Sequence, residues 1–163
     1  MSQRSQSIFF FASAILFALL FFLPLAEYLG EINILRFNAY GVESLLPDGE
    51  VPFGKWYALP VLILTVTALL LSGYLAIGLQ KAIKLNDFMR LHRVACIDIV
   101  VIVAWIALVF AYYVRAVGLS INVAQPEYKA GIFLPLAALI FVLLGFTGLR
   151  KDIKKVRSTD RIR

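Results

Sequence analysis

The sequence is short of the residues on which most metal centres depend. Its 163 residues include one cysteine and one histidine, and only 16% of them are charged. A single cysteine excludes an intrachain disulfide and a cysteine-based metal cluster, and Cys96 lies in an apolar run, as a small buried side chain does. A single histidine, His92, excludes a metal or haem site built on several histidines. We therefore expect no metal and no other cofactor.

Catalytic patterns are missing as well. The sequence has no glycine-rich phosphate loop, no Ser/His/Asp set, no paired cysteines and no paired carboxylates within an apolar run. It also lacks an internal inverted repeat and the twinned broken helices of many transporters. The sequence therefore favours a protein that is not an enzyme.

The sequence is instead rich in long apolar runs. Apolar residues make up 61% of the chain, and its mean hydropathy is +0.86, which is too apolar for a water-soluble domain. They gather in four blocks, each close to the roughly 20 residues that a helix needs to cross a hydrocarbon core of about 30 Å. The blocks cover residues 8–28, 56–79, 94–114 and 131–149. We predict an all-α membrane protein with a four-transmembrane-helix bundle over residues 1–149. The first block is too long for a typical signal peptide, and we expect it to be retained.

Basic residues are divided unevenly between the segments that flank these blocks. The N-terminus, the second connection and the C-terminal tail together hold twelve lysines and arginines, against four in the first and third connections. Basic residues near the ends of a membrane helix stay preferentially on the cytoplasmic side. We therefore predict a multi-pass protein of the bacterial inner membrane with both termini in the cytoplasm, and the net charge of +6 belongs to that face.

The first outer connection, residues 30–55, is long enough to fold. Residues 32–40 are rich in β-formers, and Pro47-Asp48-Gly49 has the composition of a turn before Val51. We predict a small β-hairpin-like periplasmic loop between the first two helices, with its turn at Pro47–Gly49. The other outer connection, near residues 115–130, reads as a plain loop.

Small residues recur on two of the predicted helices. Without a hydrophobic drive between helices in lipid, such residues let backbones approach closely. We predict a helix-packing seam, within the chain or toward another membrane subunit, at Ala68, Ser72, Gly73, Ala76, Gly78, Gly145 and Gly148, with Ala137 and Ala138 nearby.

The tail, residues 150–163, is basic and amphipathic. Continued as a helix, it places Leu149, Ile153 and Val156 on one face with basic residues around the rest. We predict that it contacts anionic lipids at the cytoplasmic face or a partner protein through Arg150, Lys151, Lys154, Lys155, Arg157, Arg161 and Arg163. Contact with the ribosome or a nucleic acid stays open, because the charge pattern does not separate acidic protein from phosphate.

Asp98 is the only charged residue well inside a predicted span. A carboxylate there costs a few kcal/mol on insertion scales unless it is paired or protonated. Because Arg93, Lys81, Lys84 and Arg4 lie near the same end of the bundle, we favour a structural ion pair or hydrogen bond. A role in handling protons or ions is the alternative.

Both ends of the chain carry recognisable sequence. The start, Gln3-Arg4-Ser5-Gln6-Ser7, leads into a run that closes with Phe22-Leu23-Pro24-Leu25-Ala26-Glu27, and the end reads Val156-Arg157-Ser158-Thr159-Asp160-Arg161-Ile162-Arg163. Nearly the whole chain resembles a family of small four-helix inner-membrane proteins of the Bacteroidota, domain of unknown function 4293. The resemblance implies topology and cell-envelope location but no catalytic residue.

Three functions remain open on these grounds. The first is a non-enzymatic accessory or structural subunit of a larger inner-membrane complex such as a translocon, a respiratory complex or a secretion assembly. The second is a small transporter or lipid-handling protein that uses Asp98. The third is a docking platform at the cytoplasmic face that uses the basic tail. The first agrees best with a minimal bundle that has no reactive site of its own.

Overall fold

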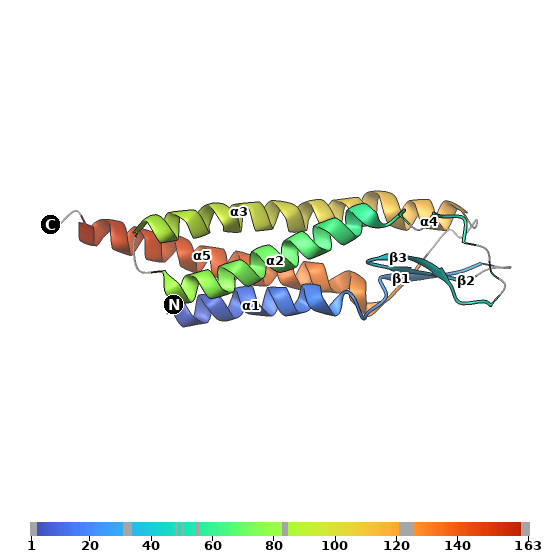
Figure 1. Cartoon of the computed structure of the whole chain (residues 1–163), viewed down its shortest axis with the longest axis horizontal. Helices are drawn as coiled ribbons and strands as arrows, with labels where there is room; N and C mark the ends of the chain where they lie inside the picture. The colour runs from blue at the N-terminus through green and yellow to red at the C-terminus, as the bar shows by residue number, and fades with distance from the viewer. Residues whose placement is uncertain are drawn as a thin grey trace.

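Four long helical segments make up most of the protein. The computed structural model describes residues 3–30, 34–47, 49, 51–54, 56–82, 85–120 and 126–160, without the side chains of residues 3, 4, 85, 159 and 160. The long helices are α1 (Gln3–Leu19), α2 (Leu59–Lys81), α3 (Leu85–Leu108) and α5 (Leu134–Asp160). α3 continues through the π-helical η1 (Val109–Tyr113) into α4 (Val114–Ser120), and α5 follows the short 3-10 helix η2 (Ala130–Phe133). Successive segments run in opposite directions (Figure 1).

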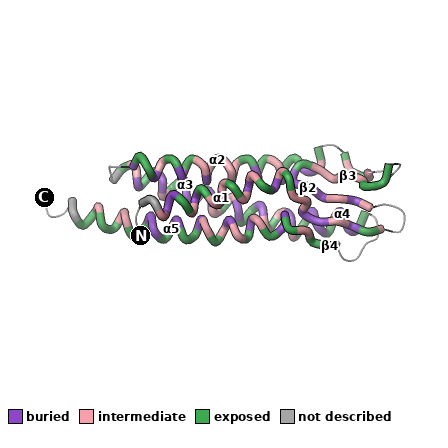
Figure 2. The backbone as a smooth tube through the Cα atoms, turned by 90° about the horizontal axis from the view of Figure 1, so that it is seen from below, coloured by how far each residue is buried: buried purple, intermediate pink, exposed green. Residues whose placement is uncertain are grey.

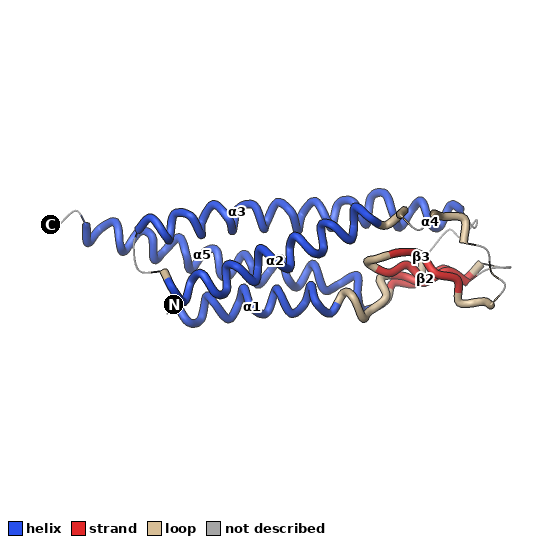
Figure 3. Tube along the Cα trace, in the orientation of Figure 1, coloured by secondary structure: helices blue, strands red, loops and turns tan. Residues whose placement is uncertain are grey.

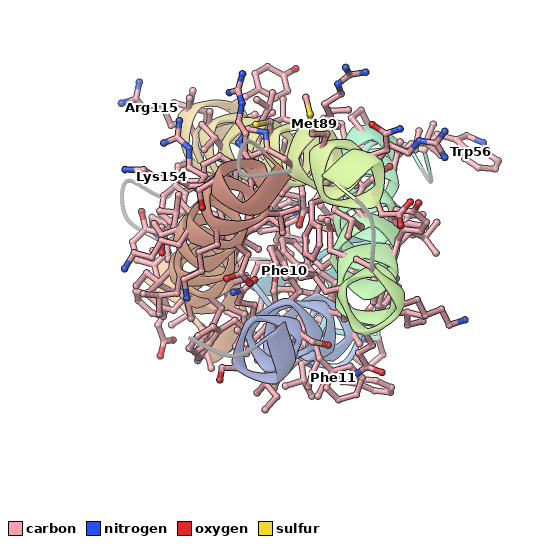
Figure 4. The ribbon with its side chains drawn as sticks, turned by 90° about the vertical axis from the view of Figure 1, so that its left-hand side faces the viewer. Phe10, Phe11, Trp56, Met89, Arg115 and Lys154 are labelled. Carbon is pink, nitrogen blue, oxygen red and sulfur yellow. The ribbon has the colours of Figure 1, made fainter. Side chains whose placement is uncertain are left out.

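The helices form a closed ring in which each contacts two neighbours. α1 contacts α2 and α5, and α3 contacts the same two helices from the opposite corner. Seen from the end of the bundle, Phe10 points into the space between the helices, whereas the next residue, Phe11, points away (Figure 4). Buried residues follow the inner face of each helix, and many large apolar side chains are exposed on the outer face (Figure 2).

Three of the four segments are long and apolar enough to cross a membrane: Leu59–Lys81, Asn86–Ser120 and Ala130–Ser158. Pro60 and Pro135 are the second residues of α2 and α5, where a missing backbone N–H breaks no helical hydrogen bond. The third and fourth blocks form longer helices than predicted, because flanking polar residues continue the helical hydrogen bonds beyond the apolar runs.

The first block differs from its predicted span of 8–28. The described apolar helix covers only Ser5–Leu19, and α1 ends at Leu19, before Pro24. Proline lacks the N–H that a helix interior needs. The chain then enters a strand, β1 (Ala26–Leu29), because an antiparallel partner is available to satisfy its backbone groups.

A four-stranded antiparallel sheet covers the end of the bundle opposite the termini (Figure 3). Its order is β3-β2-β1-β4, with β2 (Ile34–Asn38), β3 (Gly41–Ser44) and β4 (Glu127–Tyr128). The predicted hairpin exists as β2 and β3, and the turn that joins its two strands lies at Ala39 and Tyr40. The predicted turn at Pro47–Gly49 is present, since the Gly49 N–H donates to the Leu46 carbonyl at 3.2 Å, but it follows β3 and does not join the strands. Asp48 itself lies outside the described residues.

The sheet draws on two segments in which the sequence predicted no strand. β1 comes from the end of the first apolar block, and β4 comes from the connection expected to be a plain loop. β1 pairs with the next strand, β2, and also with β4, which lies about 100 residues later in the chain. Local sequence carries little information about such distant pairing. The two outer connections are therefore joined into one cap.

The cap is packed onto the bundle through aromatic side chains. The Tyr113 ring of η1 stacks on Phe37 of β2 at 5.7 Å between centroids and meets the Tyr57 ring edge-on at 5.0 Å. The Tyr113 hydroxyl donates to the Tyr57 carbonyl at 2.8 Å, and the Tyr28 hydroxyl of β1 donates to the Val114 carbonyl at 3.0 Å. In η1 the Val114 N–H donates to the carbonyl of Val109, five residues back, and this wider turn directs both Val109 and Tyr113 inward.

One carboxylate ties three parts of the cap together. The two Glu27 oxygens of β1 lie 2.9 Å from Arg36 Nη2 and 3.0 Å from Lys129 Nζ, and Lys129 also pairs with Glu127 of β4 at 2.9 Å. Hydrogen bonds from Lys129 and Arg36 hold the pKa of Glu27 below its ordinary value, against the opposing effect of burial. Glu27 is therefore the centre of this ionic cluster.

The chain passes very close to itself where η2 begins. The Gly131 N–H donates to the Pro24 carbonyl at 3.1 Å. A Cβ at this position would lie 2.5 Å from the same oxygen and 2.9 Å from the Leu23 carbonyl oxygen. Only glycine therefore allows the start of α5 to reach the connection between α1 and β1.

We expect Gly131→Ala to destabilise the protein by about 1–3 kcal/mol, because the new methyl group must push two backbone segments apart. Thermal unfolding in detergent measures the effect. Gly41→Ala is the control, since a Cβ at Gly41 has nothing within 4 Å. Equal stability of the two variants would contradict the close approach.

Glu27→Gln tests the ionic cluster through its dependence on pH. The folded-state pKa of Glu27 is lowered from 4.5, so its pairs stabilise the protein fully above pH 4.5 and lose this effect as the pH falls through the lowered pKa. We expect the variant to be less stable by about 1 kcal/mol near neutral pH. Thermal midpoints of the two proteins should converge below pH 4.5; a difference independent of pH would show that the carboxylate charge is not the cause.

Candidate functional site

Asp98 of α3 lies at the meeting point of three helices. Its side chain is fully buried, and its Oδ2 accepts a hydrogen bond from Ser72 Oγ of α2 at 2.8 Å. Ser72 Oγ lies 3.2 Å from Ser13 Oγ of α1. Among the described residues, Asp98 Oδ1 has no hydrogen-bond partner. Ser13, Ser72 and Asp98 thus form a small buried polar cluster with one unused acceptor.

Local sequence explains how this cluster is assembled. Ser72 lies one turn from both Ala68 and Ala76, and all three are buried. Their small side chains let α1 come close enough for Ser13 to reach Ser72. On α1, Ser13 shares a face with the buried Phe10 and Phe17, at helical spacings of three and four residues.

For Asp98 the sequence predicted an ion pair or a hydrogen bond, and the structure shows the hydrogen bond, which comes from Ser72. No described side chain forms an ion pair with Asp98. The side chains of Arg4 and Lys84 lie outside the described residues. α3 begins at Leu85, so Asp98 lies thirteen residues, or about 20 Å, from its start. This is deeper in the bundle than the predicted span placed it, and it explains why a surface cation does not reach it.

Further polar contacts follow the bundle interior on both sides of this cluster. Trp105 Nε1 donates to Thr65 Oγ1 at 2.8 Å on the side toward the sheet. Toward the chain ends, Ser7 Oγ donates to the Ala76 carbonyl at 2.6 Å, and Gln6 Nε2 donates to Asp152 Oδ2 at 2.7 Å. Sequence reasoning missed these contacts, although Gln6, Phe10, Ser13 and Phe17 repeat at helical spacing.

The predicted packing-seam residues divide between inner and outer surfaces. Ala68, Ser72 and Ala76 are buried within the bundle. A Cβ at Gly145 or Gly148 would lie 2.7 Å from the Phe10 ring or from Gln6 Cγ, so these glycines bring α5 close to α1. Gly78 lies against Leu91 of α3 in the same way, whereas a Cβ at Gly73 would meet nothing within 4 Å. Except at Gly73, the seam is used inside the chain.

The tail is the last part of α5 and not a separate helix, because α5 runs without a break from Leu134 to Asp160. Ile153 and Val156 pack against the core beyond Leu149, as the amphipathic pattern predicted. The last part of α5 continues along the bundle axis and does not turn across the end of the bundle (Figure 1). The exposed basic residues on it are Arg150, Lys151, Lys154, Lys155 and Arg157, while Arg161 and Arg163 lie outside the described residues.

The single histidine and the single cysteine are neighbours on α3. His92 Nδ1 lies 4.0 Å from Cys96 Sγ, and the His92 ring faces the Phe146 ring of α5 at 4.9 Å. Within the described residues, no group of three or more His, Cys, Asp or Glu side chains is placed to hold a metal ion.

These features define a membrane-compatible helical bundle with a small polar cluster in its apolar interior, a sheet at one end and basic residues at the other. The chain belongs to the family described as Domain of unknown function (DUF4293), whose model matches residues 2–162. No curated protein and no solved structure matches it.

Replacing Asp98 separates its hydrogen bond from its charge. Asparagine retains an oxygen that accepts from Ser72, so we expect Asp98→Asn to fold with unchanged or higher stability. Asp98→Ala leaves Ser72 without this acceptor and opens a cavity, and we expect a loss of about 1–3 kcal/mol. Expression level and thermal unfolding in detergent are the readouts; damage from asparagine equal to that from alanine would mean that the carboxylate itself is required.

Proposed function

We propose that this protein is a non-enzymatic accessory subunit of a larger bacterial inner-membrane complex. Three helices suited to crossing a membrane support placement in a bilayer, with α1 as a shorter fourth span. The excess of basic residues on the side of the termini supports a cytoplasmic location for both chain ends. A translocon, a respiratory complex or a secretion assembly offers the setting in which such a subunit would act.

The observation that carries the proposal is an apolar surface at the far end of the sheet, which we call the sheet tip. Its residues are Leu29, Leu45 and Leu46, whose side chains are 61%, 43% and 38% exposed. Leu29 ends β1, and the Leu45 N–H donates to the carbonyl of Ile34, the residue paired with Leu29, so these residues lie together. Contiguous exposed apolar surface of this kind marks contact sites for other proteins.

Lipid does not account for the sheet tip. The charged Glu27, Arg36 and Lys129 lie in the sheet between the bundle and the tip. Partly exposed ion pairs belong in the headgroup or water layer, because the hydrocarbon core penalises charge strongly. Leu29 lies two residues beyond Glu27 on β1, farther from the bundle, and is therefore beyond the hydrocarbon. A protein partner with an apolar outer surface is the occupant that fits.

Asp98 supports a second candidate function. Its Oδ1 is buried without a hydrogen-bond partner, and such a free acceptor is a feature of sites that exchange a proton or bind a polar group. Under this reading the protein is a small transporter or lipid-handling protein. Such a function requires the Asp98 carboxylate itself, so we expect Asp98→Asn to abolish function without lowering protein abundance.

Mild-detergent affinity purification from native membranes tests the subunit proposal. We expect a stoichiometric membrane complex with the full-length chain, identified by mass spectrometry, and its loss in Leu29→Ser/Leu45→Ser, because serine removes apolar contact area from the sheet tip. Tyr40→Ser is the control, since Tyr40 is a similarly exposed side chain of the same sheet at the end beside the bundle.

Two results would contradict the proposal. A clean monomer with no partner would reject the subunit and favour the Asp98 alternative. A complex that survives the Leu29/Leu45 change but dissociates when the chain is truncated after Arg150 would move the contact from the sheet tip to the basic tail.

A further inference from the structure

A second surface feature lies at the opposite end of the bundle, where α5 passes α3. Here a cavity of about 220 Å³ is lined by His92 of α3 and by Arg150, Ile153, Lys154 and Arg157 of α5. The three basic residues are spaced by four and three positions, so they lie on one face of α5. The structure thus separates them from Lys151 and Lys155, which follow the same spacing on a different face.

Two contacts with the Phe146 ring position the Arg150 and His92 side chains that line this cavity. The Arg150 guanidinium lies 5.2 Å from the centre of the Phe146 ring, and the His92 ring faces the same ring at 4.9 Å. Stacking of this kind restricts an otherwise mobile arginine and leaves its N–H groups available to a ligand. His92 Nδ1 faces Cys96 Sγ at 4.0 Å, so Nε2 is the ring nitrogen that it can offer to the cavity.

The five described residues that line the cavity include three basic side chains and no acidic one. Asp152, the acidic residue of this helical turn, accepts a hydrogen bond from Gln6 of α1 instead. Three cations within two turns of helix repel one another, and an anion between them removes that repulsion.

An apolar surface continues directly from the cavity toward the middle of the bundle. One turn along α5 is Phe146, and another turn brings Leu143, whose side chain is 42% exposed. The matching positions on α3 are Cys96 and then Val100, which is 66% exposed. The two helices therefore present a basic end followed at once by exposed apolar side chains.

We propose that this cavity binds the phosphate of an anionic phospholipid, with the acyl chains lying along the Leu143 and Val100 surface. Arg150, Lys154 and Arg157 bind the phosphate oxygens, and His92 adds a fourth donor. Basic cavities between membrane helices bind anionic lipid headgroups for this reason, and charge-assisted hydrogen bonds from arginine give them selectivity. The assignment does not depend on the accessory-subunit proposal.

A lipid fits both halves of the site, whereas other anions fit only one. Free inorganic phosphate has no group to cover the exposed Leu143 and Val100 side chains. An acidic peptide would meet the cations but would have to bury its backbone polar groups against Leu143 and Val100, at a penalty that acyl chains avoid.

The test uses the full-length protein in a neutral detergent, titrated with phosphatidylglycerol, with phosphatidylcholine and with inorganic phosphate. Binding is followed through thermal stabilisation and through retained lipid in native mass spectrometry. We expect phosphatidylglycerol alone to bind. Lys154→Gln/Arg157→Gln should weaken this binding about tenfold or more, because each well-placed basic residue contributes several-fold.

The matched control is Lys151→Gln/Lys155→Gln, which removes the same charge from the same helix but not from the cavity. It should change the affinity by less than about threefold. Equal losses in the two double variants would overturn the proposal in favour of a diffuse basic surface. Equal binding of phosphatidylcholine, or stabilisation by inorganic phosphate alone, would overturn it as well.

A third variant keeps the test decisive if a double variant folds poorly. His92→Phe preserves an aromatic ring beside Phe146 but removes the ring nitrogens. With the basic residues intact, it should still weaken phosphatidylglycerol binding several-fold. Unchanged phosphatidylglycerol binding in His92→Phe would overturn the proposal.

Discussion

The hydrogen-bonded contact between Ser13, Ser72 and Asp98 joins three of the four helices at one level of the bundle. Apolar side chains gain little by meeting one another in lipid, since the lipid tails are equally apolar. Close backbone approach and interior hydrogen bonds must then hold the helices together. The small side chains of Ala68 and Ala76 allow close backbone approach beside Ser72, and the hydroxyls of Ser13 and Ser72 provide the interior hydrogen bonds.

The fourth helix is held by the same combination in another place. Gly145 and Gly148 bring α5 against Phe10 and Gln6 of α1. The Gln6 amide then reaches Asp152 at 2.7 Å, just beyond the apolar part of α5. One face of α1 thus meets α2 through serines and α5 through glycines. This explains how α1, the shortest of the four long helices, is held against both of its neighbours.

The two ends of the bundle differ in surface chemistry. At one end, Glu27 and the Tyr113 cluster join both connections into a cap whose outermost side chains are apolar. At the other end, α5 extends beyond Leu149 as a basic helix beside His92. We propose a protein partner for the apolar sheet tip and a lipid headgroup for the basic cavity. The length of the bundle separates the two surfaces.

The sequence determined the parts of the fold that depend on local composition. Apolar length predicted the helices of α2, α3 and α5, and the spacing of Leu149, Ile153 and Val156 predicted the helical tail, because burial in lipid and helical periodicity are readable within a single segment. Small residues at Ala68, Ser72 and Ala76 likewise marked an interface, although not its partner. Tertiary structure alone decided that β1 and β4 pair, that Glu27 meets Lys129, and that Ser72 donates to Asp98. Each of these features depends on residues far apart in the chain, whose pairing is fixed by which backbones and charges are brought together in space.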